Sequence, residues 1–274
     1  MTESWARLPR MSTLRHVLPA LLLAPALAAA EPAPVKPEWS GTAGAGVIHL
    51  TGNTSTTTVN GAAAVQREWA KWILALRTTS VYGRTRPADR STPSETVALA
   101  SSGQLRGDRK LAPHLSVFTI VGAETDHVAS LEYRAFGDAG ASVVWIDRKQ
   151  EGDRHLFLRT DLGGRYAYDS RWQYYATAAA PVGDLEDVEL LAPRIGATFQ
   201  LALSKDTTFV EEAEVLANVL GDERYNARSQ TKLTTRLVSA LTIGAAYLVA
   251  WDSAPAPGKV ETDTKLSFIA EVAF

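Results

Sequence analysis

The chain has 274 residues, of which 46% are hydrophobic and 21% charged, and its formal net charge is −2. This composition excludes a disordered chain and a helical membrane bundle, and the near-neutral charge gives no sign of nucleic-acid binding. The absence of cysteine excludes disulfides, thiolate metal sites and cysteine nucleophiles.

The N-terminus has the pattern of a secretory signal peptide. Arg7, Arg10 and Arg15 precede an apolar run that ends in small residues, so cleavage is expected after Ala30. The apolar run is short and is broken by two prolines, which argues against a membrane-spanning helix. We therefore expect an exported protein.

From residue 38 onward, apolar and polar residues alternate with a period of two, which is the pattern of β-strands. No window shows a sustained helical period, so an all-β chain is predicted. The expected strands cover residues 38–51, 55–67, 70–84, 94–106, 112–126, 132–147, 154–169, 188–202, 206–219, 224–237, 240–252 and 260–274.

The length and the connections of these strands favour a membrane barrel. Strands of about 13–15 residues exceed the usual soluble strand and suit a tilted membrane crossing. Short turns alternate with longer loops, and successive hairpins of this length would leave two long edges unless the sheet closed. The predicted fold is a closed antiparallel up-and-down transmembrane β-barrel of about 12 strands, and the alternative is a soluble β-sandwich. The expected divisions are a signal peptide over 1–30, a proline-rich lead over 31–37 and the barrel over 38–274.

Charged residues share one face of the strands in the second half of the chain and are expected to line the lumen. Paired charges would plug the lumen, whereas an excess of arginine would leave a narrow pore that prefers anions. The expected lumen residues are Arg159, Asp161, Arg165, Arg194, Glu212, Glu214, Arg224, Arg228, Lys232, Arg236, Lys265 and Glu271.

Large aromatic residues fall near the predicted strand ends, where the two interfacial girdles of a membrane barrel require them. They are Trp39, Trp72, Tyr82, Trp145, Tyr166, Trp251 and Phe274.

The sequence carries no catalytic or metal-binding motif, so no catalytic residue, metal or cofactor is expected. The histidines are scattered. The one nearby grouping of candidate catalytic side chains is His127 with Asp126 and Ser130, in a predicted turn, and it leaves an outer-membrane enzyme acting on lipid as an alternative.

Several motifs together resemble one known family. "WSGTAGAG", "TGNTSTTTVN", "DTTF", "PAPGKVETDT" and the terminal Phe274 are similar to the salt-induced outer-membrane (YdiY-like) proteins, a domain of unknown function grouped with transmembrane β-barrels. The segment "AAAPVGDLEDVELLAP" departs from the usual pattern. The resemblance implies the outer membrane of a Gram-negative cell and a link to osmotic or salt stress.

The C-terminal strand also resembles the signal by which the barrel-assembly machinery recognises its clients, with Phe268, Ala270, Val272 and Phe274 as the apolar row. The expected partners are therefore outer-membrane lipid, that machinery and periplasmic chaperones, for a monomer that binds no nucleic acid. The expected function is a narrow pore or a structural envelope protein. A soluble periplasmic binding protein and a lipid-directed enzyme are the alternatives.

Overall fold

The computed structural model describes residues 39–50, 54–87, 93–150, 154–176, 178–179, 181–221 and 223–274. The chain divides into two units, Met1–Glu31 and Pro32–Phe274, and all described residues belong to the second. The predicted signal peptide, its cleavage position Ala30 and the proline-rich lead lie outside the described residues.

Among the described residues, no helix is long and apolar enough to cross a membrane.

The described part of the chain is built from thirteen β-strands, of which β8 has only two residues. Their bounds are β1 Trp39–Leu50, β2 Thr54–Glu68, β3 Trp72–Pro87, β4 Glu95–Ala112, β5 Leu115–Asp126, β6 Leu131–Gln150, β7 Arg154–Gln173, β8 Gly183–Asp184, β9 Val188–Ala202, β10 Thr207–Ala217, β11 Tyr225–Arg236, β12 Leu241–Asp252 and β13 Thr262–Ala273.

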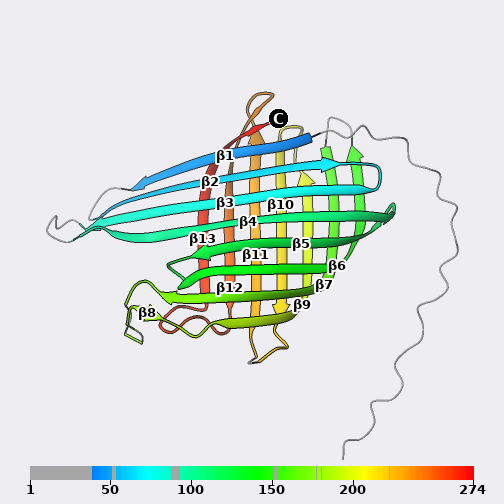
Figure 1. The fold of residues 1–274 in the computed structure, drawn as a ribbon. Helices are drawn as coiled ribbons and strands as arrows, with labels where there is room; N and C mark the ends of the chain where they lie inside the picture. The colour runs from blue at the N-terminus through cyan, green and yellow to red at the C-terminus, as the bar shows by residue number, and fades with distance from the viewer. Residues whose placement is uncertain are drawn as a thin grey trace, which may run out of the picture. The chain divides into compact units, whose positions relative to one another are not determined.

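Twelve of these strands form one closed sheet. Each pairs antiparallel with its neighbours in the sequence, and β13 pairs back with β1. Between β7 and β9, which pair directly, the short strand β8 pairs only with the last two residues of β7. Figure 1 shows β1 to β7 crossing in front of β10 to β13, as opposite walls of a tilted closed sheet must. The predicted up-and-down barrel is confirmed. The alternative of a two-sheet sandwich is wrong, because a single sheet closes on itself.

The two ends of the barrel differ in their connections. At the end that holds Trp39 and Phe274, connections such as Trp69–Lys71 and Pro113–His114 have two to four residues. At the other end they reach fourteen residues, between Gln173 and Val188. We call these the short-turn end and the long-loop end. This asymmetry is the one that outer-membrane barrels show.

The predicted strand boundaries agree with the structure to within a few residues except in β4. The sequence indicated a turn at the segment Gly107–Leu111, but β4 continues through a β-bulge near Lys110 to Ala112. The backbone N–H of Lys110 donates to the carbonyl oxygen of Lys71 at 2.9 Å. Polar residues that resemble a turn are therefore strand residues whose side chains alternate between the two faces.

The seam between β1 and β13 closes the ring. Gly41 and Phe274 exchange both backbone hydrogen bonds, at 2.9 and 3.0 Å. The register then runs from Thr42 opposite Ala273 to Ala45 opposite Ala270 and stops there, whereas β1 pairs with β2 along its whole length.

Candidate functional site

Ion pairs between distant strands identify the inner face of the barrel. Arg77 on β3 and Glu212 on β10 lie 2.8 Å apart, Nη1 to Oε1, although these strands are six places apart in the ring of twelve. Their side chains can meet only across the interior. Because residues opposite each other on neighbouring strands share a face, the register extends this assignment around the ring.

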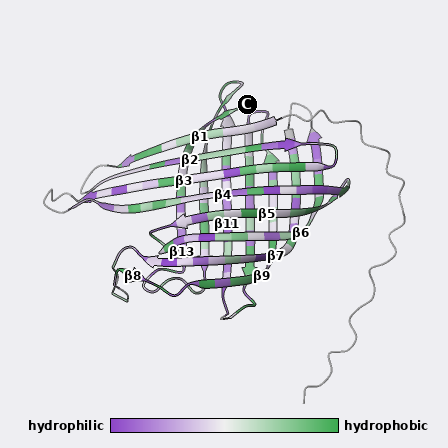
Figure 2. Cartoon of the chain, viewed as in Figure 1, coloured by the Kyte–Doolittle hydropathy of each residue, from purple (hydrophilic) through white to green (hydrophobic). Residues whose placement is uncertain are grey.

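The outer face is apolar, which reverses the arrangement of a water-soluble protein. Leu162, Ile195 and Leu266 are 56%, 59% and 53% exposed, whereas Asp138 and Arg165 on the inner face are 2% and 8% exposed. Figure 2 shows hydrophobic and hydrophilic residues alternating along the strands. Such a wall fits hydrocarbon outside and polar groups inside.

A cluster around Asp138 fills one side of the lumen. Arg165 donates two hydrogen bonds to the Asp138 carboxylate, at 2.7 and 2.8 Å. Arg194 approaches the same carboxylate at 3.3 Å. Glu214 lies 3.1 Å from Arg194 and 3.3 Å from Arg165. Two arginines and two carboxylates thus neutralise each other on the joined inner walls of β6, β7, β9 and β10.

A second cluster lies around Asp161, towards the short-turn end. Arg106 reaches across from β4 to donate to Asp161 at 2.5 Å and to Asp108 at 2.8 Å. Ser142 donates its hydroxyl to Asp161 at 2.6 Å, and Arg159 lies 3.4 Å from it. Each oxygen of the Asp161 carboxylate therefore has a charged or polar donor.

A third cluster lies towards the long-loop end. Arg134 holds Asp169 with two hydrogen bonds, at 2.5 and 2.7 Å, and Glu124 with one at 2.8 Å. Arg224 pairs with Asp252, and it lies 3.5 Å from Asp169. Arg228 lies 3.9 Å from Glu124 across the lumen, with 45% of its side chain exposed.

The remaining expected lumen residues have separate places. Lys232 donates to Glu271 at 2.5 Å on the inner walls of β11 and β13. Arg236 ends β11 at the short-turn rim, where it lies 3.5 Å from Asp206 in a turn. Lys265 is half-buried on the inner face of β13. Arg236 thus belongs to the rim, and the others lie along the lumen.

The sequence analysis missed five of the nine carboxylates in the lumen pairs, together with three arginines: Arg77, Arg106, Asp108, Glu124, Arg134, Asp138, Asp169 and Asp252. Without the rim pair of Arg236 and Asp206, the pairs described above join nine basic side chains to nine acidic ones, so these pairs contain no excess of arginine. The signal that could have found them is the alternation within β4, where Arg106, Asp108 and Lys110 occupy every second position.

The inner wall on either side of the β1–β13 seam has a different character. There β1, β2 and β12 present small or uncharged residues to the lumen: Thr42, Gly44, Thr58, Asn60, Ala62, Gly244, Ala246, Leu248 and Ala250. The lumen therefore has two sides. We call the wall that holds the clusters around Asp138 and Asp161 the charged side, and the wall formed by β1, β2 and β12 beside the seam the seam side.

The grouping around His127 serves the long-loop rim. Asp126 accepts backbone hydrogen bonds from Val128 and Ala129, both at 3.1 Å. Ser130 is fully buried and donates its hydroxyl to Gln173 at 2.6 Å. The His127 ring stacks on Tyr174 at 4.0 Å. Burial, followed by the negative charge of Glu132, raises the pKa of the Tyr174 phenol. The three candidate catalytic side chains have separate partners and do not form a relay.

Among the described residues, no group of three or more acidic or histidine side chains is placed to hold a metal ion.

Exposed aromatic residues mark both ends of the outer wall. At the short-turn end, Trp39, Trp72 and Trp145 are 57%, 51% and 62% exposed. Towards the long-loop end, Tyr82 and Trp251 are 45% and 37% exposed. Such belts suit the two membrane interfaces. The other expected aromatic and C-terminal signal residues also have exposed outer-wall or terminal positions: Tyr166, Phe268, Ala270, Val272 and Phe274.

A family model described as "Protein of unknown function, DUF481" matches residues 43–274, nearly the whole described barrel. The chain belongs to the DUF481 family. This is the YdiY-like family that the sequence motifs resemble, so that resemblance is confirmed. No curated protein matches the sequence.

Solved structures similar to this DUF481 chain have low sequence identity to it. An outer membrane channel from Pseudomonas putida F1 has a TM-score of 0.43 at 11% identity, covering 89% of this chain and 97% of that one. The beta domain of the Bordetella autotransporter Brka has 0.42 at 7%, covering 87% and 99%. The NanC porin has 0.41 at 12%, covering 86% and 99%.

Proposed function

We propose that this DUF481 barrel spans the outer membrane and carries small hydrophilic solutes or ions through a narrow, charge-lined lumen. The observation that carries the proposal is the pair Arg77–Glu212, which crosses the interior while 49% and 34% of its side chains stay exposed. An interior closed by side chains would bury both groups. Water therefore reaches the middle of the lumen beside a buried ionic cluster.

The passage lies along the seam side of the lumen. The clusters around Asp138 and Asp161 occupy the charged side, where these carboxylates are 2% and 5% exposed. Arg228 and Arg77 border the seam side, with 45% and 49% of their side chains exposed. Because acidic and basic partners are balanced, ion selectivity depends on these accessible arginines and is a modest preference for anions.

The outer-membrane location is supported by the closed sheet, the apolar outer wall and the exposed aromatic residues at both ends. The N-terminal signal pattern of the sequence supports export. A role under osmotic or salt stress rests on the family resemblance alone. A deletion strain that grows normally at high salt would remove that part of the proposal.

Single-channel recording in planar lipid bilayers tests the pore. Purified protein, with heat-modifiable gel migration as the check of folding, is expected to give small discrete conductance steps. Reversing charge with Arg228→Glu and Lys232→Glu should shift ion preference towards cations. Lys205→Glu, in an exposed short turn, is the matched control and should leave the preference unchanged. Unaltered selectivity in the double variant would contradict conduction past these residues.

A structural barrel with a blocked lumen is the second candidate, and the burial of the Asp138 cluster favours it. Its expected result is a correctly folded, membrane-inserted protein that gives no conductance steps. Removing the bridge between Arg77 and Glu212 would then also fail to produce conduction.

A further inference from the structure

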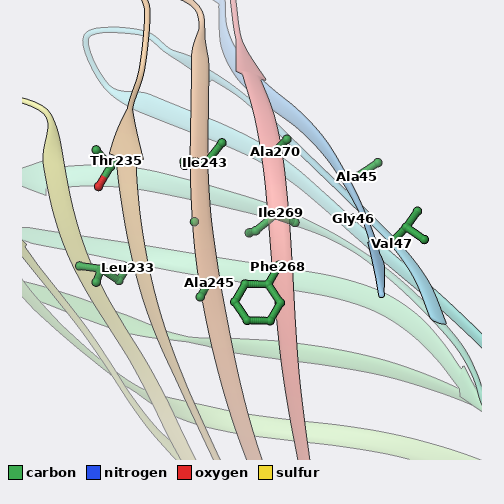
Figure 3. A pocket seen from close by; sticks show the side chains of 11 residues that line it. Ala45, Gly46, Val47, Leu233, Thr235, Ile243, Ala245, Phe268, Ile269 and Ala270 are labelled. Atoms are coloured by element: carbon green, nitrogen blue, oxygen red, sulfur yellow. The ribbon is translucent and has the colours of Figure 1, made fainter. Parts of the chain in front are cut away.

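The β1–β13 seam is paired at its short-turn end only. Four residue pairs are in register, from Thr42–Ala273 to Ala45–Ala270, whereas β12 and β13 pair from Leu241–Val272 to Trp251–Thr262. Beyond Ala45, the rest of β1 moves away from β13, as the two ribbons in Figure 3 show. Among the described residues, 46–50 and 262–269 therefore have a partner strand on one side only.

The separated edges carry backbone groups that need partners. Gly41 and Phe274 form a pair that exchanges both hydrogen bonds, and in an antiparallel ladder such pairs recur at every second residue. Phe268, Leu266 and Thr264 accordingly turn their N–H and C=O groups towards the seam. Hydrocarbon cannot satisfy these groups, so water from the lumen has to reach the edge of β13.

Glycine 46 is where the two strands part. A Cβ atom on Gly46 would lie 1.8 Å from the carbonyl oxygen of Phe268, and one on Gly44 would lie 2.9 Å from that of Ala270. Only glycine allows so close an approach of two backbones. The crossing at Gly46 therefore separates a tightly paired seam from an open one.

An apolar groove lies on the outer face of this crossing (Figure 3). It is a shallow, open groove with a volume of about 610 Å³. Its principal side chains are Val47, Leu233, Ile243, Ala245 and Phe268. An aliphatic chain suits such a lining.

The inner face beside the opening combines apolar and basic groups. Ile269 is 9% exposed and Ala246 is likewise 9% exposed on the inner wall. Ile48, on β1, belongs to the same inner row. Lys265 adds positive charge to the inner wall of β13, whereas the ammonium group of Lys232 is paired with Glu271. An apolar path thus leads from the outer groove to the ammonium group of Lys265 inside.

We propose that the open part of the β1–β13 seam is a lateral portal between the lumen and the hydrocarbon layer for long-chain fatty carboxylates. The alkyl chain occupies the outer groove, and the carboxylate meets Lys265 on the inner wall. The portal rests on the proposed membrane-spanning barrel, but it is independent of whether the lumen conducts ions.

Paired cysteines test whether the seam is open in a membrane, since the chain has no cysteine of its own. Thr42→Cys with Ala273→Cys joins a pair that is in register. Ile48→Cys with Ser267→Cys extends the same register by six residues, on the same inner face. In lipid vesicles under mild oxidant, the first pair should form a disulfide and the second should keep free thiols, because a disulfide needs Cα atoms within about 7 Å.

Equal oxidation of the two pairs would show a fully paired seam and would overturn the portal. Disulfides between two copies of the chain at the second pair would overturn it as well, because a second chain would then fill the opening.

Lipid access to the inner face is the second test. Single variants Ser267→Cys, at the opening, and Ser102→Cys, on the inner wall of β4, would each carry the same fluorescent label. Vesicles containing doxyl-labelled stearate are expected to quench the label at position 267 and leave that at position 102 bright. Equal quenching at both positions, or none at either, would contradict the portal.

The two proposals fail in different ways. Loss of conductance with retained quenching at position 267 removes the pore and keeps the portal. Conductance without that quenching removes the portal and keeps the pore.

Discussion

The charged side and the seam side of the lumen are built from the same type of strand but differ in how far the strands pair and in which side chains face the lumen. On the charged side, β6 and β7 meet through eighteen registered pairs and bury carboxylates such as Asp138 against arginines. On the seam side, β1 and β13 have twelve residues each and meet through four registered pairs. There β1 presents small or uncharged residues to the lumen, whereas β13 adds Lys265 and Glu271. Strand pairing is therefore extensive on the charged side, whereas it stops part-way along the strands on the seam side.

This contrast indicates that changes within the ionic clusters affect the stability of the barrel more than the ion selectivity of the proposed pore. A buried ion pair contributes little net stability by itself, but loss of one partner leaves an uncompensated charge. The charged side therefore tolerates few changes, whereas the accessible groups at the border of the seam side are the ones that solutes in the proposed pore would meet.

The largest expected effect tests the charged side. Asp138→Asn leaves Arg165 and Arg194 buried without a carboxylate and should lower the free energy of unfolding by about 3–5 kcal/mol. Urea unfolding in lipid vesicles, followed by gel migration, measures it. Asp263→Asn, at the exposed start of β13, is the control and should change stability by no more than about 0.5 kcal/mol. If both variants lost the same free energy of unfolding, the charged side would not be more sensitive to change than the start of β13.

The next effect tests whether the outer wall meets hydrocarbon on the charged side. Leu162 on β7 and Val182 in the connection after β7 are both 56% exposed. Leu162→Arg should cost about 2–4 kcal/mol of stability in vesicles if that surface faces the bilayer, and Val182→Arg should cost nothing measurable. If the two variants unfold alike, the outer wall faces water and the membrane location is wrong.

A smaller effect tests the seam. Gly46→Ala places a Cβ against the Phe268 carbonyl oxygen and should destabilise the barrel by about 1–3 kcal/mol. The matched control is Gly61→Ala, where the nearest neighbour of the new Cβ lies 3.8 Å away, and its unfolding should be unchanged or slightly shifted to higher urea. A neutral Gly46→Ala would mean that the strands do not cross this closely.

The smallest expected effect on stability concerns the ion pair at the border between the charged side and the seam side. Arg77 and Glu212 are partly exposed, and such pairs contribute about 0–1 kcal/mol. The double variant Arg77→Ala with Glu212→Ala should therefore keep its unfolding midpoint but increase single-channel conductance, because the bridge across the lumen is gone. An unchanged conductance would place the ion path elsewhere.

The sequence predicted the closed sheet because alternation is a local property. Odd positions of β11 and β12, such as Leu233 and Ile243, repeat it without interruption. The partners inside the lumen are not local: Arg77 and Glu212 are 135 positions apart in the chain. Asp138, between glycine and alanine neighbours, gave no charge pattern that would have marked it.

The open part of the β1–β13 seam could not be predicted from the sequence for a related reason. β1 alternates in the same way on both sides of Gly46, and periodicity does not record where a register ends. The close approach of Gly46 to Phe268 depends on the path of a strand from the other end of the chain.

The unequal strand lengths have a consequence for how the proposed membrane-spanning barrel would sit in lipid. At about 3.3 Å per residue and a tilt near 40°, a strand of twelve residues rises about 30 Å, and one of twenty rises about 50 Å. In a thicker bilayer, the low wall around β1 would suffer hydrophobic mismatch while the high wall would not. The barrel should then tilt in the bilayer, and a change in bilayer thickness would strain the β1–β13 seam, which has only four residue pairs in register.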